Sequence, residues 1–174
     1  MKKKLLIATG VLILWLFIAN SVCGMFVKGN DIAPKRIQMQ DYESATISEV
    51  FFSLGETESI QDLSETFQLS GWSFCETTQP NDTKTITAIW KRSDGLAYGV
   101  EIAGQQRPDI RAAFPDKEIV GDMHGFTTKI STISMKNGVY ELLLYDKEND
   151  AAQGLVSTGL FFKKEGRMFT AYGV

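Results

Sequence analysis

Cysteine and histidine are scarce in this chain of 174 residues, which contains only Cys23, Cys75 and His124 of these two types. One histidine and one cysteine beyond the N-terminal segment exclude the usual zinc sites, which need four Cys or His ligands. A lone cysteine also excludes a disulfide within the folded part, so that part depends on its apolar core. We expect Cys75 to be a small buried residue, and pairing with another chain is the alternative.

Basic residues are also fewer than acidic residues, especially after the N-terminal lysines. The chain has 18 Lys and Arg residues against 21 Asp and Glu residues, and three of the lysines are Lys2, Lys3 and Lys4. The remaining 15 basic residues therefore leave a net charge of −6. Nucleic acids and anionic membrane surfaces attract clustered Lys and Arg, so neither is an expected partner of the folded part.

Charged side chains are absent from the 23 residues 5–27, which follow the three lysines. A helix of this length reaches about 34 Å and spans a hydrocarbon core of roughly 30 Å. We predict a signal-anchor over residues 1–27 with a single membrane span, followed by a linker over residues 28–40. Cleavage as a signal peptide and lipidation at Cys23 remain alternatives. In all three cases the positive-inside rule keeps the N-terminus cytoplasmic and the C-terminal domain extracytoplasmic.

Long helical periods are missing from residues 41–174, which hold about eight short apolar runs separated by turn residues. In one run Ile86, Ala88 and Trp90 share a face, as in a strand with one buried side. The runs are residues 41–53, 67–76, 83–92, 96–104, 125–135, 138–146, 154–164 and 167–174. The only plausible helix lies in residues 56–67, with a short helical turn in residues 109–114. The pattern predicts an all-β domain over residues 41–174, an antiparallel β-sandwich of Ig-like or jelly-roll-like type.

The single histidine invites a catalytic interpretation. A hydrolase would use His124 as a base, oriented by Asp122 or Asp109, with Ser131 or Ser134 as the nucleophile. No serine lies in a G-x-S-x-G elbow, and the spacing of these residues does not favour catalysis. We therefore predict a non-enzymatic protein without a cofactor, in which residues 104–124 form a long connection between two sheets.

Ligand-binding residues are sought first in that connection, where Arg107, Asp109 and His124 are the candidates. A structural role is favoured for each, with Arg107 and Asp109 holding the crossover through hydrogen bonds. Four aromatic residues offer faces for sugar rings: Trp72, Trp90, Tyr98 and Tyr140. Core packing is the favoured role of Trp90 and Tyr98, and the stretch "GWSF" predicts that Trp72 is buried on a central strand. No metal site is predicted. The acidic stretch "DKEND", residues 146–150, offers clustered oxygen ligands that suit calcium but lacks EF-hand spacing, so calcium binding there stays open.

Four short motifs occur in one order along the chain: "SGWSF", "RPDI", "HGFTTKI" and "NGVYELLLYD". This order resembles an extracytoplasmic β-sandwich module of bacterial cell-surface and membrane-anchored proteins, with Ser73 where that pattern usually has alanine. The matching positions are Gly71, Trp72, Arg107, Asp109, Gly125, Phe126, Gly138 and Tyr140. The resemblance implies a module found beside glycan-synthesis or cell-envelope proteins, with no reaction assigned to it.

These features predict a membrane-anchored, extracytoplasmic module that binds a component of the cell envelope, either a glycan or a membrane-protein partner. One alternative is a structural or assembly subunit without a small ligand. A less favoured alternative is an envelope hydrolase that uses Asp109, Asp122 and His124. The binding hypothesis predicts an aromatic or polar groove on one face of a sheet.

Overall fold

The computed structural model describes residues 31–55, 58–60, 66–79 and 84–172. The predicted membrane segment, residues 5–27, lies outside these ranges. Among the residues that are described, no helix is both long and apolar enough to cross a membrane. The chain from Ile32 onward forms one folded unit.

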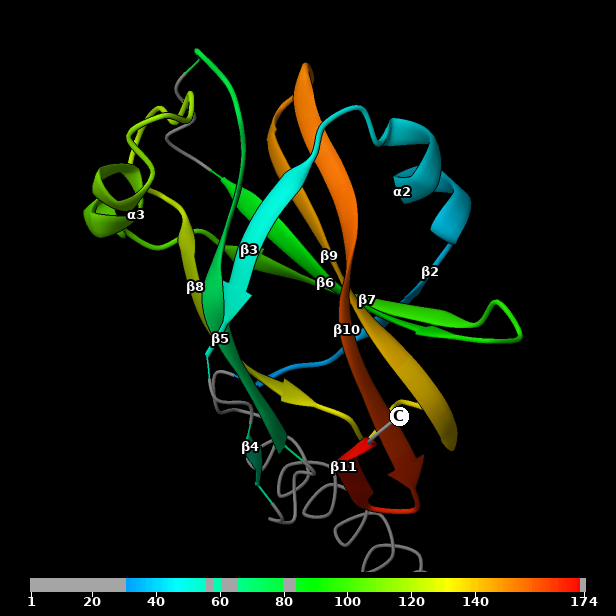
Figure 1. The fold of residues 1–174 in the computed structure, drawn as a ribbon. Helices are drawn as coiled ribbons and strands as arrows, with labels where there is room; N and C mark the ends of the chain where they lie inside the picture. The colour runs from blue at the N-terminus through cyan, green and yellow to red at the C-terminus, as the bar shows by residue number, and fades with distance from the viewer. Residues whose placement is uncertain (1–30, 56–57, 61–65, 80–83, 173–174) are drawn as a thin grey trace, which may run out of the picture. The chain divides into compact units, whose positions relative to one another are not determined.

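Two antiparallel β-sheets make up most of this unit (Figure 1). The strands are β1 (Asp31–Ile32), β2 (Lys35–Ile37), β3 (Val50–Leu54), β4 (Glu58–Ile60), β5 (Thr66–Cys75), β6 (Thr85–Arg92), β7 (Ala97–Ala103), β8 (Gly125–Ser131), β9 (Gly138–Asn149), β10 (Ala152–Glu165) and β11 (Met168–Tyr172), and the helices are α2 (Met39–Ala45) and α3 (Pro108–Ala113). The large sheet has the order β11-β10-β9-β6-β7-β2. The small sheet has the order β1-β8-β5-β3, with β4 also beside β5. The all-β, antiparallel prediction is confirmed.

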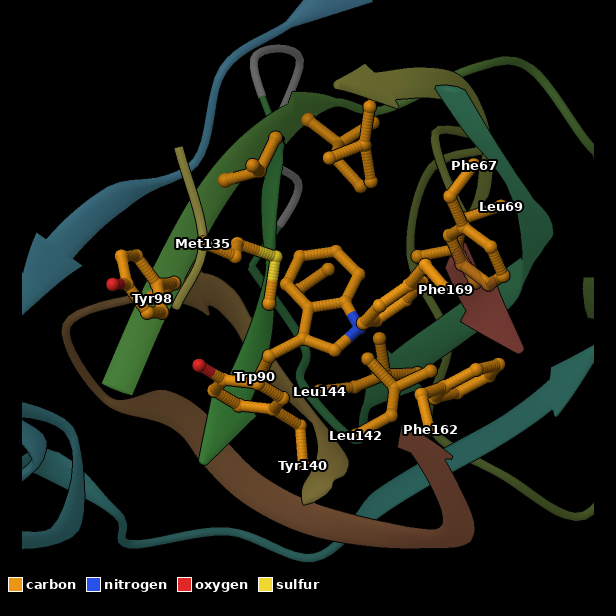
Figure 2. Close-up of a cluster of buried hydrophobic side chains, with 14 of the residues drawn as sticks. Phe67, Leu69, Trp90, Tyr98, Met135, Tyr140, Leu142, Leu144, Phe162 and Phe169 are labelled. Carbon is orange, nitrogen blue, oxygen red and sulfur yellow. The ribbon is translucent and has the colours of Figure 1, made fainter. Parts of the chain in front are cut away.

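The main apolar core of the described residues lies between the two sheets. Trp90 is at its centre, flanked by Met135 and Tyr98 on one side and Phe169 on the other (Figure 2). Phe67 of the small sheet meets Trp90 of the large sheet edge to face, with 6.3 Å between the ring centroids. Trp90 and Tyr98 therefore pack in the core, as expected, and the two sheets face each other as the layers of a β-sandwich do.

Each sheet carries a short helix on its outer face (Figure 1). Met39, Tyr42 and Ala45 of α2 pack against the outward side chains of the large sheet, including Leu143. Ile110 of α3 packs against Phe74 and Ile119 beside the small sheet. The helical turn predicted in residues 109–114 is confirmed by α3.

Two predictions of local structure are wrong. Residues 56–67 were expected to be helical, but β4 occupies Glu58–Ile60 and pairs with the start of β5. Backbone pairing with β5, itself fixed between β3 and β8, outweighs the helical preference of this polar stretch. The run at residues 41–53 begins in a helix, because the apolar side chains of α2 recur every third residue and fit the outer face of the large sheet.

The expected linker over residues 28–40 also needs correction in its second half. Lys35–Ile37 forms β2, which pairs with β7 at the edge of the large sheet. Ile37 then packs against the same outer cluster as α2. The folded unit therefore begins earlier than residue 41, because a three-residue strand and the following helix bury apolar side chains there.

Candidate functional site

A groove of about 320 Å³ lies over the outer face of the small sheet. Its lining includes outward-facing side chains of β3, β5 and β8, together with the segment that leads into α3. The side chains that matter most here are Ser53, Ser70, Trp72, Arg107 and Thr127. Each strand contributes because alternate residues point outward, as Thr127 does beside the buried Phe126. The groove is therefore rich in hydroxyl groups and bordered by one indole ring and one guanidinium.

Two glycines give the groove its shape. A Cβ atom at Gly125 would lie 2.5 Å from Cγ of Arg107, so the arginine stem rests on the bare backbone of β8. A Cβ atom at Gly71 would lie 2.4 Å from the backbone oxygen of Ser53. A side chain at either position would clash with these neighbouring atoms, which explains why the sequence has glycine at both.

Arg107 and Asp109 form a bidentate ion pair at the rim of the groove. Nε of Arg107 donates to Oδ1 of Asp109 at 2.8 Å, and Nη2 donates to Oδ2 at 2.7 Å. The hydrogen bonds from Arg107 hold the pKa of Asp109 below its usual value, and those same bonds raise the pKa of Arg107. The backbone N–H of Arg107 also donates to the carbonyl of Asp122 at 2.6 Å. The structure therefore brings two of the three ligand-binding candidates together.

Of the four aromatic residues considered for sugar stacking, Trp72 alone lines the groove. It lies on the outer face of β5 and is only partly buried, so the prediction of a buried Trp72 is wrong. Its ring stacks on Phe74 at 5.9 Å and tilts against Phe114 at 5.3 Å, which fixes its orientation. Tyr140 is fully buried, and its hydroxyl donates to the carbonyl of Lys136 at 2.7 Å. A groove ligand can therefore use Trp72 as its aromatic contact.

His124 points into the domain and away from the other residues of the hydrolase hypothesis. Its side chain is only 2% exposed, with Nδ1 3.4 Å from Oε1 of Glu148. Asp122 instead lies 3.6 Å from Arg111, and Asp109 pairs with Arg107. Among the described residues, no hydrogen bond or ion pair joins His124 to Asp109 or Asp122.

The two serines considered as nucleophiles do not join His124 either. Oγ of Ser134 donates to the carbonyl of Pro34 at 3.4 Å. Ser131 is 8% exposed at the end of β8, where it pairs with Thr66 of β5, whereas His124 precedes the start of β8. The proposed hydrolytic constellation is not assembled in this arrangement.

His124 instead belongs to a buried charge cluster, which consists of Ser73, Lys84, His124, Asp146 and Glu148. Nζ of Lys84 lies 2.9 Å from Oδ2 of Asp146 and 2.5 Å from Oε1 of Glu148. It also donates to the carbonyl of Ser73 at 2.5 Å. The side chains of Lys84 and Asp146 are 0% exposed and that of Glu148 is 2% exposed. The cluster is therefore sealed from water.

The two carboxyl groups of the cluster differ in acidity. Burial raises the pKa of Asp146, and this effect exceeds the opposing attraction of Lys84. Burial also acts to raise the pKa of Glu148, but the hydrogen bond from His124 and the charge of Lys84 together lower it. Asp146 is thus biased toward the neutral acid and Glu148 toward the carboxylate.

The acidic stretch at residues 146–150 is not a calcium-binding loop in the structure, since β9 extends through Asn149. Asp146 and Glu148 point inward and Lys147 points outward. In the part of the chain that the structure describes, no group of His, Cys, Asp and Glu side chains is placed to hold a metal ion. Sequence alternation carries a signal for this arrangement, because residues 140, 142, 144, 146 and 148 share one face of a strand.

Cys75 lies beside the cluster and is expected to resist alkylation in the folded protein. The residue is 1% exposed, and its thiol donates weakly to the backbone oxygen of Asp146 at 3.8 Å. Burial raises the pKa of this thiol, so very little reactive thiolate forms. Iodoacetamide at pH 8 should modify the peptide with Cys75 only after denaturation, as peptide mass spectrometry would measure. Rapid modification of the native protein would contradict the buried position.

No protein-family model matches this chain, and no curated protein or solved structure matches it at a significant level. The resemblance to the extracytoplasmic module therefore stays a prediction.

Proposed function

We propose that this protein is a membrane-anchored, extracytoplasmic β-sandwich module that binds a glycan of the cell envelope and catalyses no reaction. The observation that carries this proposal is the groove on the small sheet, where Trp72 and Arg107 meet several hydroxyl side chains. Such a groove is the feature that a binding module of this kind requires. The motif positions Gly71, Gly125 and Phe126 also line it.

The chemistry of the groove favours a sugar over a charged ligand. A sugar ring offers one apolar face for an aromatic side chain and a rim of hydroxyl groups for hydrogen bonds. Trp72 provides the aromatic contact, and Ser53, Ser70 and Thr127 provide hydroxyl groups. Arg107 is neutralised by Asp109, which leaves Nη1 as a donor for a neutral oxygen and weakens the attraction for anions.

The non-enzymatic part of the proposal is supported by the position of the titratable groups. A general base must lie within hydrogen-bond reach of the proton that it removes. His124 and Glu148 face each other inside the domain, and neither lines the groove. Arg107 and Asp109 at the rim hold one another as an ion pair.

The membrane-anchored, extracytoplasmic location is proposed from the first 27 residues of the sequence. Three lysines followed by 23 uncharged residues favour a single span with the N-terminus in the cytoplasm. The Ig-like or jelly-roll-like type of the sandwich belongs to the same proposal. Reporter fusions at the C-terminus test the topology, because only an extracytoplasmic alkaline phosphatase is active.

Replacement of Thr127 by glutamate is expected to weaken glycan binding on the order of tenfold or more, about 1.4 kcal/mol. Thr127 is exposed on β8 and lines the groove, so the longer glutamate side chain occupies the space that the sugar needs. The full-length chain in detergent would first be screened on an array of envelope glycans. Binding isotherms would then be measured for the best glycan.

The matched control is Lys129→Glu, since Lys129 is also exposed on β8, two residues further along the strand and outside the groove. This variant should bind as the wild type does. Equal weakening by both changes would show that the groove is not the binding surface. A screen in which no envelope glycan binds would reject the glycan itself.

An assembly subunit is the second candidate function, and the edge of the large sheet favours it. β11 is the last strand in the order of the described large sheet. Met168 is 52% exposed and Tyr172 is 48% exposed on this strand. An edge strand with exposed apolar side chains can pair with another chain. Cross-linking in native membranes that captures a partner through β11, with no glycan bound, would favour this alternative.

A further inference from the structure

The buried charge cluster holds an amine and a carboxyl group in a fixed, dry contact. β6 and β9 are neighbours in the large sheet, and Ile86 pairs directly with Asp146. Lys84 lies two residues before Ile86 and therefore on the same face of the chain. This register brings Nζ of Lys84 to 2.9 Å from Oδ2 of Asp146, with both side chains fully buried.

As separate ions these groups are poorly accommodated. Oδ1 of Asp146 has no hydrogen-bond partner among the described residues. A buried carboxylate needs its oxygens paired, and a buried ammonium between two carboxyl groups loses all hydration. Loss of one water molecule between Lys84 and Asp146 would turn two ionisable groups into one neutral amide.

We propose that Lys84 and Asp146 become joined by an amide bond between Nζ and Cγ, an intramolecular isopeptide cross-link, with Glu148 as the group that carries the proton. This goes beyond the proposed glycan binding and does not depend on it. The site is a modification site of the protein itself and needs no cofactor.

The reaction balances with the groups that are present. The Glu148 carboxylate takes a proton from the Lys84 ammonium, which it contacts at 2.5 Å. The neutral amine adds to Cγ of the protonated Asp146, a second amine proton is lost, and one carboxyl oxygen leaves with two protons as water. The products are a neutral amide, a water molecule and a protonated Glu148. The raised pKa of Asp146 favours the neutral acid that this step requires.

Two neighbours hold the reacting groups in place. The hydroxyl of Ser73 donates to Oδ2 of Asp146, and the carbonyl of Ser73 accepts a hydrogen bond from Nζ of Lys84 at 2.5 Å. Ser73 thus contacts both partners from the small sheet. His124, with Nδ1 3.4 Å from Glu148, orients the carboxyl group that transfers the proton. Ser73 and His124 are positioning residues, whereas Glu148 contacts the reacting amine.

The test is peptide mapping of the purified full-length protein by mass spectrometry. Trypsin does not cleave after an acylated lysine. A cross-linked protein should therefore yield residues 37–91 joined to residues 137–147, with a mass lower than the sum of the two peptides by one water. Separate peptides 85–91 and 137–147, with no joined species, would overturn the proposal. Processing of the N-terminus does not affect this measurement.

Variants separate the roles of the groups. Glu148→Gln keeps the size of the side chain but removes the proton acceptor, so the joined peptide should fall at least tenfold. Asp146→Asn should still form a cross-link, with ammonia lost in place of water. Lys164→Arg alters another buried lysine and should leave the joined peptide unchanged. A Glu148→Gln protein that is folded and fully cross-linked would overturn the role of Glu148.

Discussion

Replacement of Lys84 by methionine is expected to lower the free energy of unfolding by about 3–5 kcal/mol at pH 7, through loss of the buried cation alone. Methionine fills much of the same space, but it leaves Asp146 and Glu148 without the ammonium that both contact. If the proposed cross-link is present, Lys84 is already a neutral amide, and the variant instead loses the closure of a loop of roughly 60 residues, worth about 4 kcal/mol.

The loss should depend on pH. In the variant, burial without a cation raises the pKa of both carboxyl groups in the folded state. A raised folded pKa stabilises the protein below the unfolded pKa, about 4, and this stabilisation is lost as pH rises. In a wild type that keeps the Lys84 ammonium, the lowered pKa of Glu148 works in the opposite direction and stabilises the protein above that range. Both effects make the difference largest at pH 7 and smaller near pH 4.

Urea denaturation of wild type and variant at pH 7 and pH 4.5 measures the difference. The part of the difference in unfolding free energy that disappears in acid is due to the buried carboxylates. The part that remains at pH 4.5 is due to the cross-link. The control is Lys163→Met, which removes an exposed lysine paired with Glu165 and should change stability by less than about 0.5 kcal/mol. A Lys84→Met protein as stable as the wild type would contradict the role of the cluster.

Replacement of Phe162 by alanine is expected to cost about 3–5 kcal/mol. Phe162 is 1% exposed on β10 and lies between the sheets, with ring centroids 4.9 Å from Phe67 and 5.3 Å from Phe169. Its removal leaves a cavity where the small sheet meets the large sheet. Thermal or urea denaturation measures the loss.

The adjacent Phe161 is a matched control, because the same change is made one residue away on the opposite face of the strand. Phe161 is half-buried and lies outside the central core. Its replacement by alanine should cost about 1 kcal/mol. Equal losses at the two positions would contradict the register of β10 and the shared core.

The sequence predicted the strands whose alternation is strong. Ile86, Ala88 and Trp90 were expected on one face of a strand, and all three point into the core. The sequence did not predict α2 or β4, because packing and backbone pairing decide their conformation against their local preference. Tyr42 of α2 packs on the large sheet, and β4 depends on pairing with β5.

The sequence identified part of the candidate site. Arg107, Asp109 and His124 were the predicted ligand-binding candidates. Arg107 and Asp109 form an ion pair, whereas His124 lies apart from them in the buried charge cluster. Asp146 and Glu148 belong to the stretch for which the sequence leaves calcium binding open, and their burial is not expected because charged residues are rarely fully buried. Their burial is stabilised by pairing with Lys84, which lies more than 60 residues earlier in the sequence. No local sequence pattern reveals that partner.

We propose that ligands meet the protein at the groove, while the buried charge cluster belongs to its interior. A ¹H–¹⁵N NMR titration of the full-length chain in detergent, with the glycan selected on the array, tests this most directly. We expect shifts at Ser53, Ser70, Thr127 and the indole N–H of Trp72, with the signal of His124 unchanged. Shifts centred on His124 and Glu148, or none at the groove when the glycan is bound, would contradict it.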